Sequence, residues 1–221
     1  MSNPDPRYKL IVFDWDGTLM DSASGIVACI QEASREMGLP VPTDERASHV
    51  IGLGLRDSLR LAVPELPESA YAHFAELYRK HFLAREEAMD LFPGVHGLIA
   101  GLQGAGYSLA VATGKSRRGL DRALAASGLA SFFCASRCAD ETNPKPHPAM
   151  LLELMAELSR APAELLMIGD TSHDLDMAAS ASVDAVAVTY GAHPPEVLRA
   201  RAPKGLVGSI SELQAWLKIH G

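Results

Sequence analysis

The chain has 221 residues, of which 48% are hydrophobic, and a formal net charge of −7 at pH 7. This length allows one substantial hydrophobic core and a smaller one, and the acidic balance argues against general binding to nucleic acid or to an anionic membrane. No apolar stretch reaches the roughly 18 residues of a membrane span, and the polar start does not resemble a signal peptide, so we expect a cytoplasmic protein.

Short apolar strands alternate with amphipathic helices along most of the chain. We predict strands at 9–13, 108–112, 132–135, 165–168, 185–189 and 205–207, and helices at 93–105, 116–127, 148–159, 172–181, 195–202 and 211–218. Such alternation is typical of a parallel sheet covered by helices. The predicted fold class is therefore α/β, with a Rossmann-like parallel sheet flanked by helices.

The pattern changes between the first and second predicted strands. Residues 21–87 contain no convincing strand but three helical stretches, near 22–37, 55–63 and 67–84. We therefore predict an inserted helical cap domain over 21–87 and a core domain made of 1–20 and 88–221. Because the insertion leaves and rejoins the core beside the end of the first strand, it should lie over that end as a lid.

Polar residues stand where several predicted strands end. Asp14 and Asp16 follow the first strand, and because residues two apart on a strand face the same way, they should emerge as neighbours. Thr113 and Asp170 follow the second and fourth strands. Ligands of open parallel sheets bind beyond these carboxyl ends, where the strand order reverses. Because clustered carboxylates repel one another unless a proton or a cation relieves them, a divalent metal is expected here.

These residue types fit the transfer of a phosphoryl group. A carboxylate can attack phosphorus to form an acyl phosphate, and a second carboxyl can protonate the departing oxygen and later deprotonate water. A hard cation prefers carboxylate oxygens as ligands. Thr113 and Lys145 would supply a hydrogen-bond donor and a positive charge to the oxygens that gain charge in the transition state.

Four motifs then make the sequence recognisable: DWDGTLMDS at 14–22, TGK at 113–115, KP at 145–146 and GDTSHDLDMA at 169–178. In this order they resemble the motifs of the haloacid dehalogenase superfamily, in particular its phosphatases with a helical cap, the phosphoglycolate phosphatase-like group. The resemblance covers nearly the whole chain. It implies that Asp14 is the nucleophile, that Asp16 is the acid and base, and that Thr113 and Lys145 bind the phosphate.

The same resemblance implies a magnesium site. Asp14, the backbone carbonyl of Asp16 and Asp170 would hold Mg²⁺, with Asp174 acting directly or through water. Asp174 also stands in the opening turn of a predicted helix, where a carboxylate is favoured by the helix dipole alone.

Other polar residues are candidates for contact with the substrate. Gly114 belongs to the predicted phosphate loop, although many relatives carry Asn or Ser there. Arg56 in the cap could clamp a substrate carboxylate or a second phosphate, but an exposed arginine at a helix start fits equally well. Lys115 and Arg117 belong to a short basic run that is usually solvated but that begins a helix near the phosphate.

Three further side chains carry structural expectations. His173 and His147 have no partners at ligand spacing, so we expect them to be exposed or to cap helices. Trp15, between the two aspartates, should pack under the loop or line the mouth of the site.

We predict a magnesium-dependent phosphatase that acts on a small-molecule phosphate ester through an aspartyl phosphate, with no nucleic-acid or membrane partner, as a monomer or a homodimer. Asp16 argues against dehalogenation, because a halide leaves without a proton. A β-phosphoglucomutase-like sugar phosphomutase stays open, although Ile26 stands where such mutases carry a cap histidine. A pyrophosphatase, a nucleotide phosphatase and an inactive phosphate-binding protein are further alternatives.

Overall fold

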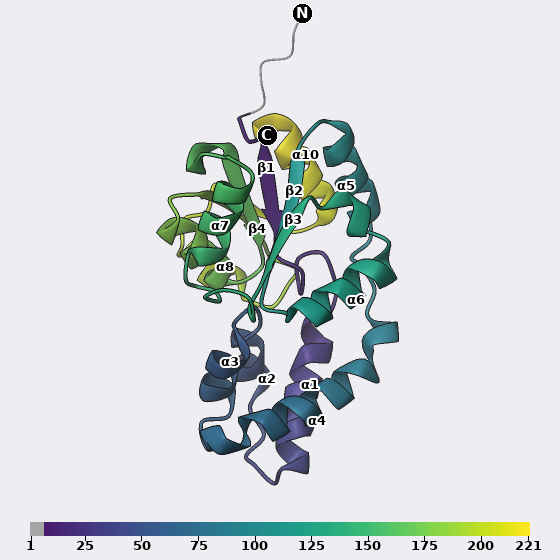
Figure 1. Cartoon of the computed structure of the whole chain (residues 1–221), viewed down its shortest axis with the longest axis vertical. Helices are drawn as coiled ribbons and strands as arrows, with labels where there is room; N and C mark the ends of the chain where they lie inside the picture. The colour runs from purple at the N-terminus through teal and green to yellow at the C-terminus, as the bar shows by residue number, and fades with distance from the viewer. Residues whose placement is uncertain (1–6) are drawn as a thin grey trace, which may run out of the picture.

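The structure is a computed structural model that describes residues 7–221, except for the side chain of residue 87. An α/β core lies at one end of the molecule and a bundle of helices at the other (Figure 1). None of the helices in the described part of the chain is both long and apolar enough to span a membrane.

Within residues 7–221, the core is built on one sheet of six parallel strands. The strands are β1 (Leu10–Phe13), β2 (Ser108–Thr113), β3 (Ala135–Cys138), β4 (Leu165–Gly169), β5 (Asp184–Val188) and β6 (Gly205–Val207). Their order is β3-β2-β1-β4-β5-β6. The predicted fold class is thus confirmed.

Helices cover both faces of this sheet. One layer holds α5 (Val95–Gly104), α6 (Arg117–Ser127) and α10 (Ile210–His220), and the other holds α7 (Ala149–Glu157), α8 (Ser172–Ser180) and α9 (Pro195–Arg199). Strand β1 shows why: Ile11 and Phe13 pack into the first layer, whereas Leu10 and Val12 pack into the second. A strand buried on both faces reads as a continuous apolar run rather than as an alternating one.

The inserted helices have a hydrophobic core of their own. They are α1 (Ala23–Glu36), α2 (Asp44–His49), α3 (Leu55–Ala62) and α4 (Tyr71–Leu83), with the short 3-10 turns η1 (Glu68–Ala70) and η2 (Glu86–Ala88). Ile30, Leu59 and Phe74 are among the buried residues of this second core. The name cap is used below for this helical segment.

Helix α2 was not predicted, although the sequence carries a signal for it. The Thr43 side chain accepts a hydrogen bond from the backbone N–H of Arg46 at 3.2 Å, and Asp44 and Glu45 occupy the first turn. A threonine cap followed by acidic residues is a standard helix start. The helix is short and only Ala47 within it is buried, so its apolar periodicity is too weak to predict it.

The third strand lies further along the chain than predicted. The prediction placed it at 132–135, but Ala130–Phe132 forms a 3-10 turn (η3) and the strand runs from Ala135 to Cys138. β3 is an edge strand that pairs only with β2, so it needs no apolar run. Phe132 and Phe133 are apolar because they pack against the core from the loop before the strand.

The strand order places the polar strand ends together. β1 lies between β2 and β4, and the order reverses at this point. The backbone N–H of Asp14 donates to the carbonyl of Ile168 at 2.9 Å, which ties the end of β1 to the end of β4. The carboxyl ends of β1, β2 and β4 therefore face one locus, the position expected for a ligand site.

Trp15 packs under the loop that follows β1, which is one of the two placements expected. Its side chain is fully buried and meets the ring of Phe133 edge-on at 6.4 Å between centroids. Its carbonyl accepts the backbone N–H groups of Leu19 and Met20, both at 3.0 Å. The indole therefore packs beneath the loop that carries Asp14 and Asp16.

We predict that Trp15→Ala lowers the free energy of unfolding by about 3–5 kcal/mol, because a large aromatic side chain is removed from a packed core. Urea denaturation followed by circular dichroism measures the loss. Trp216→Ala is the matched control, because Trp216 is only partly buried, and its loss should be smaller. Equal losses in the two variants would contradict the role given to Trp15.

Candidate active site

A buried lysine lies between two buried aspartates at the end of the sheet. Lys145 Nζ lies 2.7 Å from Asp14 Oδ1 and 2.6 Å from Asp174 Oδ1, and all three residues are fully buried. They come from three places in the chain: the end of β1, the loop before α7, and the first turn of α8. The charges of Asp14 and Asp174 outweigh the effect of burial and raise the pKa of Lys145, so the amine stays charged.

Asp170 completes the group from the end of β4. Its Oδ1 accepts the hydroxyl of Thr18 at 2.7 Å, and its Oδ2 accepts the backbone N–H of Ala192 at 2.7 Å. Two glycines make room for it: a Cβ on Gly17 would lie 2.2 Å from Asp170 Oδ2, and one on Gly191 would lie 2.3 Å from it. Gly17 also has φ of +78°, a conformation that glycine alone adopts without strain.

Asp174 is engaged through both of its oxygens. Oδ2 accepts the backbone N–H of Thr171 at 3.0 Å and its hydroxyl at 2.7 Å, closing a capping box at the start of α8. Oδ1 contacts Lys145. Both structural roles that a carboxylate can play at this position, capping the helix and pairing with a cation, are therefore present.

The donor set fits a divalent cation. Oxygens of Asp14, Asp170 and Asp174 lie within 4.8 Å of one another. Three carboxylates against the single ammonium of Lys145 leave two negative charges when all are ionised. Asp14 Oδ2 is buried and accepts no hydrogen bond from the described residues. A buried oxygen without a partner, in an all-oxygen set with this charge, is what a hard divalent metal requires.

Burial and mutual repulsion raise the pKa values of these carboxyls. Burial, and then the charge of Asp174, raises the pKa of Asp170 to about 7. Burial also raises the pKa of Asp14 well above its ordinary value; Lys145 opposes this shift, and the two other aspartates add to it. A positive ion at this position would lower both values.

Asp16 lies apart from this group and faces a cavity. Its Oδ1 accepts the hydroxyl of Ser22 at 2.7 Å and lies 3.0 Å from Lys115 Nζ. Lys115 Nζ also lies 4.7 Å from the centre of the Phe82 ring in the cap. The basic residue Lys115 is therefore part of the site. Arg117 is not, because it pairs with Glu141 on the surface.

Thr113 and Gly114 bring the end of β2 to the same place. Thr113 is buried, and its hydroxyl oxygen accepts the backbone N–H of Lys115 at 3.2 Å, which leaves its hydrogen for another acceptor. A Cβ on Gly114 would lie 2.7 Å from the backbone of Gly52 in the cap. This contact gives the physical reason for glycine at this position: the cap loop leaves no space for a side chain.

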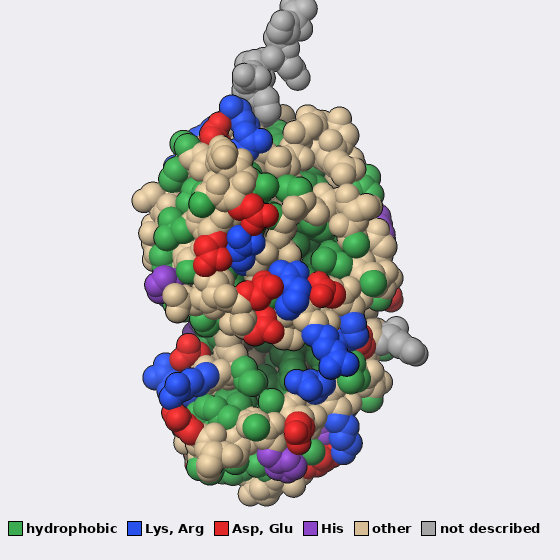
Figure 2. Space-filling model, in the orientation of Figure 1, with side chains coloured by type: hydrophobic (Ala, Val, Ile, Leu, Met, Phe, Trp, Pro, Cys, Tyr) green, Lys and Arg blue, Asp and Glu red, His purple; other side chains and the backbone are tan. Residues whose placement is uncertain are grey.

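The cavity lies between the core and the cap and has a volume of about 420 Å³. Figure 2 shows a hollow at the waist of the molecule, with hydrophobic side chains inside it and Lys and Arg side chains beside it. Arg56 does not line this cavity. It bonds to both oxygens of Glu68, at 2.8 and 3.0 Å, with 74% of its side chain exposed, so the structure does not bring Arg56 to the other predicted residues.

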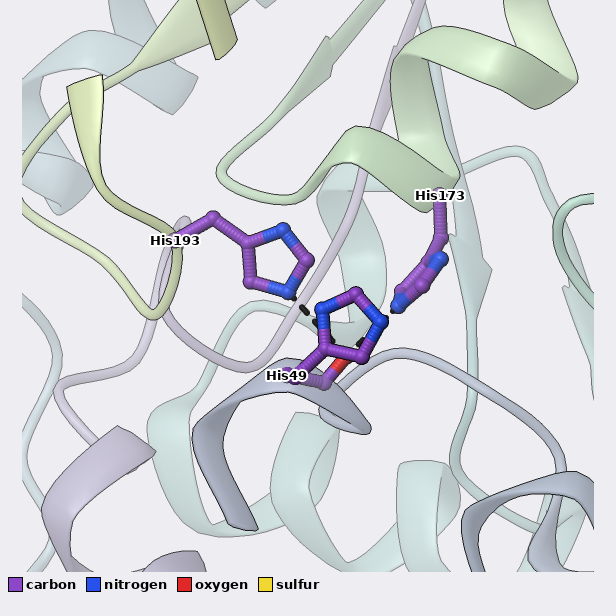
Figure 3. A group of neighbouring side chains, drawn as sticks. All are labelled: His49, His173 and His193. Atoms are coloured by element: carbon purple, nitrogen blue, oxygen red, sulfur yellow. Dashed lines mark hydrogen bonds between the residues drawn. The ribbon is translucent and has the colours of Figure 1, made fainter. Parts of the chain in front are cut away.

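A cluster of three histidines joins the cap to the core (Figure 3). Nε2 of His173 and Nε2 of His193 lie 2.7 and 3.1 Å from the backbone carbonyl of His49, at the end of α2. A carbonyl only accepts hydrogen bonds, so both imidazoles donate to it. Nδ1 of His193 accepts the backbone N–H of Ser172 at 3.0 Å, which places its proton on Nε2.

This cluster corrects one sequence expectation and adds a residue. His173 is buried rather than exposed, and no local pattern indicates its contact with a segment more than a hundred positions away. His193 was missed for the same reason. Burial, with the neighbouring His173, lowers the pKa of His193 to about 4, and burial lowers that of His173, so both rings are neutral at pH 7.

Comparison with known proteins agrees with this arrangement. The family described as haloacid dehalogenase-like hydrolase matches residues 11–188, and the chain belongs to that family. It is 38% identical over 210 residues to "Probable phosphatase IndB" of Dickeya dadantii, covering 92% of this chain and 91% of that one. It is 31% identical to "Phosphoglycolate phosphatase" of Vibrio vulnificus, covering 93% and 94%.

One further relative has a different name, and a solved structure shares the fold. "Tyrosine-protein kinase PtkA" of Mycobacterium tuberculosis is 37% identical over 193 residues, which cover 86% of this chain and 65% of that protein. Among solved structures, a putative haloacid dehalogenase-like hydrolase from Bacteroides fragilis superposes with a TM-score of 0.85 at 26% identity, covering 93% and 99% of the two chains.

We predict that Mg²⁺ binds more tightly at pH 8 than at pH 6 and that its binding releases protons. The carboxyl of Asp170, with a pKa of about 7 in the metal-free protein, is mostly protonated at pH 6 and must ionise to hold a cation. This pKa lies above the unfolded value of about 3.9, so the protonated carboxyl of Asp170 favours the folded state of the metal-free protein. That contribution to the free energy of unfolding is lost as the pH rises from the unfolded pKa through 7.

Titration calorimetry in two buffers of different ionisation enthalpy measures both the affinity and the protons released. Asp170→Asn, which cannot ionise, should lose most of the affinity and release fewer protons per bound ion, the remainder coming from Asp14, whose pKa is also raised by burial. Equal Mg²⁺ affinity at the two pH values would contradict the assignment.

Proposed function

We propose that the protein is a Mg²⁺-dependent phosphatase that hydrolyses small phosphate monoesters through an aspartyl phosphate on Asp14. The observation that carries the proposal is the position of Asp14: its carboxylate lies 2.7 Å from the buried cation Lys145 and within 4.8 Å of an oxygen of Asp170, at the end of the strand whose loop also brings Asp16 to the wall of the cavity. Membership in a family of hydrolases with phosphatase relatives supports it.

Binding of the phosphate would use the fixed donors of the core. The hydroxyl of Thr113 has a hydrogen to donate, and Lys145 is held in place by two carboxylates. Both groups are buried, so their attraction for phosphate oxygens is not weakened by water. Gly114 would let the phosphate loop lie against the cap without a side chain between them.

The chemical steps divide between the two aspartates. Asp14, whose Oδ2 has no hydrogen-bond partner among the described residues, would attack phosphorus as the bond to the leaving oxygen breaks. Asp16 would donate a proton to that oxygen and then take one from the water that hydrolyses the acyl phosphate. Ser22 and Lys115 hold Oδ1 of Asp16, which leaves Oδ2 to exchange the proton.

The residues also indicate how a metal would be held. Asp14, Asp170 and the backbone carbonyl of Asp16 would be its ligands, and it would neutralise charge on the phosphate oxygens. Asp174 would act mainly by fixing Lys145, because its other oxygen is used in the capping box.

We further propose that residues 21–87 act as a cap over the core residues 1–20 and 88–221. The cap loop contacts Gly114, and two core histidines donate to the carbonyl of His49. These contacts would keep bulk water out while the acyl phosphate forms. They join the halves through few hydrogen bonds, so they can break to release the alcohol.

A sugar phosphomutase is the less well supported alternative. One solved structure described as a putative β-phosphoglucomutase, from Bacteroides vulgatus, has a TM-score of 0.85, but at 20% identity this shows the fold alone. Ile26 stands in the wall of the cavity, and its side chain cannot exchange a proton with a sugar hydroxyl. Hydrolysis by water fits the site better.

We predict that Asp14→Asn lowers Mg²⁺-dependent phosphate release from p-nitrophenyl phosphate by about a thousandfold or more, because the amide cannot form the acyl phosphate. Steady-state assays with and without chelator measure the loss. Asp121→Asn, which removes a mostly exposed carboxylate on α6, should leave the rate unchanged. Retention of activity by Asp14→Asn would refute the proposed nucleophile.

A further inference from the structure

The two sides of the cavity differ in character. Around Asp16 and Lys115 the cavity is polar, but the cap side is lined by aliphatic and aromatic side chains. Ile30, Leu59 and Phe74 on this side are buried members of the core of the cap. The volume of about 420 Å³ falls within the range of small-molecule sites.

Few polar groups on the apolar side could serve a hydroxyl-rich ligand. The hydroxyl of Ser58 already donates to the carbonyl of Val50 at 3.2 Å. Lys115 is paired with Asp16, and Arg56 lies outside the cavity. A sugar placed against Ile30, Leu59 and Phe74 would lose hydration without gaining hydrogen-bond partners from them, which is costly.

Aromatic rings stand close to the proton donor. Tyr78 and Phe82 of α4 stack with their centroids 6.0 Å apart, and both line the cavity. The Phe82 ring lies 4.7 Å from Lys115 Nζ, which is 3.0 Å from the carboxylate of Asp16 that would protonate the leaving group. Burial, and then the charge of Asp16, raises the pKa of Tyr78. An alcohol released there meets ring faces and methyl groups.

Basic residues gather at the outer edge of the same cavity. Arg79 and Arg118 line it and are exposed, and neither forms an ion pair with the side chains that the structure describes. They give the entrance a positive potential that attracts a phosphate ester without making the interior polar.

Resting on the proposed function, we propose that the preferred substrates are phosphate monoesters whose alcohol part is an apolar body of the size of a ring. The phosphate would lie at Asp14 and Lys145, and the apolar body against Ile30, Phe74 and Tyr78. Phosphate esters of two-carbon acids and of hexoses are then poor substrates for this site. This preference differs from the substrates that the names of several relatives suggest.

Four substrates with alkyl leaving groups test the proposal, so that differences in leaving-group acidity stay small. We expect kcat/KM for 2-phenylethyl phosphate to exceed that for ethyl phosphate, 2-phosphoglycolate and glucose 6-phosphate by about tenfold or more, because burial of the ring adds binding energy in the cavity. Equal or higher kcat/KM for the hydrophilic esters would overturn the proposal.

A pair of variants shows where the preference arises. Ala75→Phe fills the cavity, which Ala75 lines, and should reduce the preference for the phenyl ester over ethyl phosphate to near unity while ethyl phosphate is still cleaved. Ala72→Phe makes the same change at an exposed position on α4 and should leave the preference intact. Preference unchanged in Ala75→Phe, with a native circular dichroism spectrum, would contradict the assigned pocket.

The two proposals fail in different ways. If neither the four esters nor p-nitrophenyl phosphate is cleaved in the presence of Mg²⁺, the proposed function is wrong. If p-nitrophenyl phosphate is cleaved but the phenyl ester has no advantage over ethyl phosphate, only the substrate class is wrong. The wild-type comparison decides the matter even if Ala75→Phe does not fold.

Discussion

Burial of three carboxylates around one lysine is the constraint on which the rest of the site depends. Asp14, Asp170 and Asp174 are fully buried, and Lys145 balances only one of their charges. Such a group is costly in a low-dielectric interior unless a cation completes it. The protein sustains it with parallel strands that end at one edge and with glycines that leave room for Asp170.

The same constraint links the carboxylate end of the site to the cap. The first turn of α8 carries Asp174, which fixes Lys145, and His173, which donates to the cap at the carbonyl of His49. On the other side, Ala192 holds Asp170 through its N–H, and the next residue, His193, donates to the same carbonyl. Segments that hold the carboxylates therefore also hold the loop that closes over them.

Local patterns predicted much of this from the sequence. The alternation of apolar strands with amphipathic helices predicted the fold class, and Asp14, Asp16 and Asp170 at the ends of such strands predicted the locus, because strand period and strand ends are local properties. Contacts between distant segments were beyond reach. The meeting of His173 and His193 at the cap and the close approach of Gly52 to Gly114 depend on how the helical insertion packs on the core. The pairing of Arg56 with Glu68 depends on how segments within the insertion pack on one another.

A crystal structure of the protein soaked with Mn²⁺, with anomalous scattering measured at the manganese edge, would show whether the buried carboxylates hold a cation. We expect one strong peak bonded to oxygens of Asp14 and Asp170, with Lys145 still in contact with Asp174. A peak among the three histidines and none at the aspartates, or no peak at all, would contradict it.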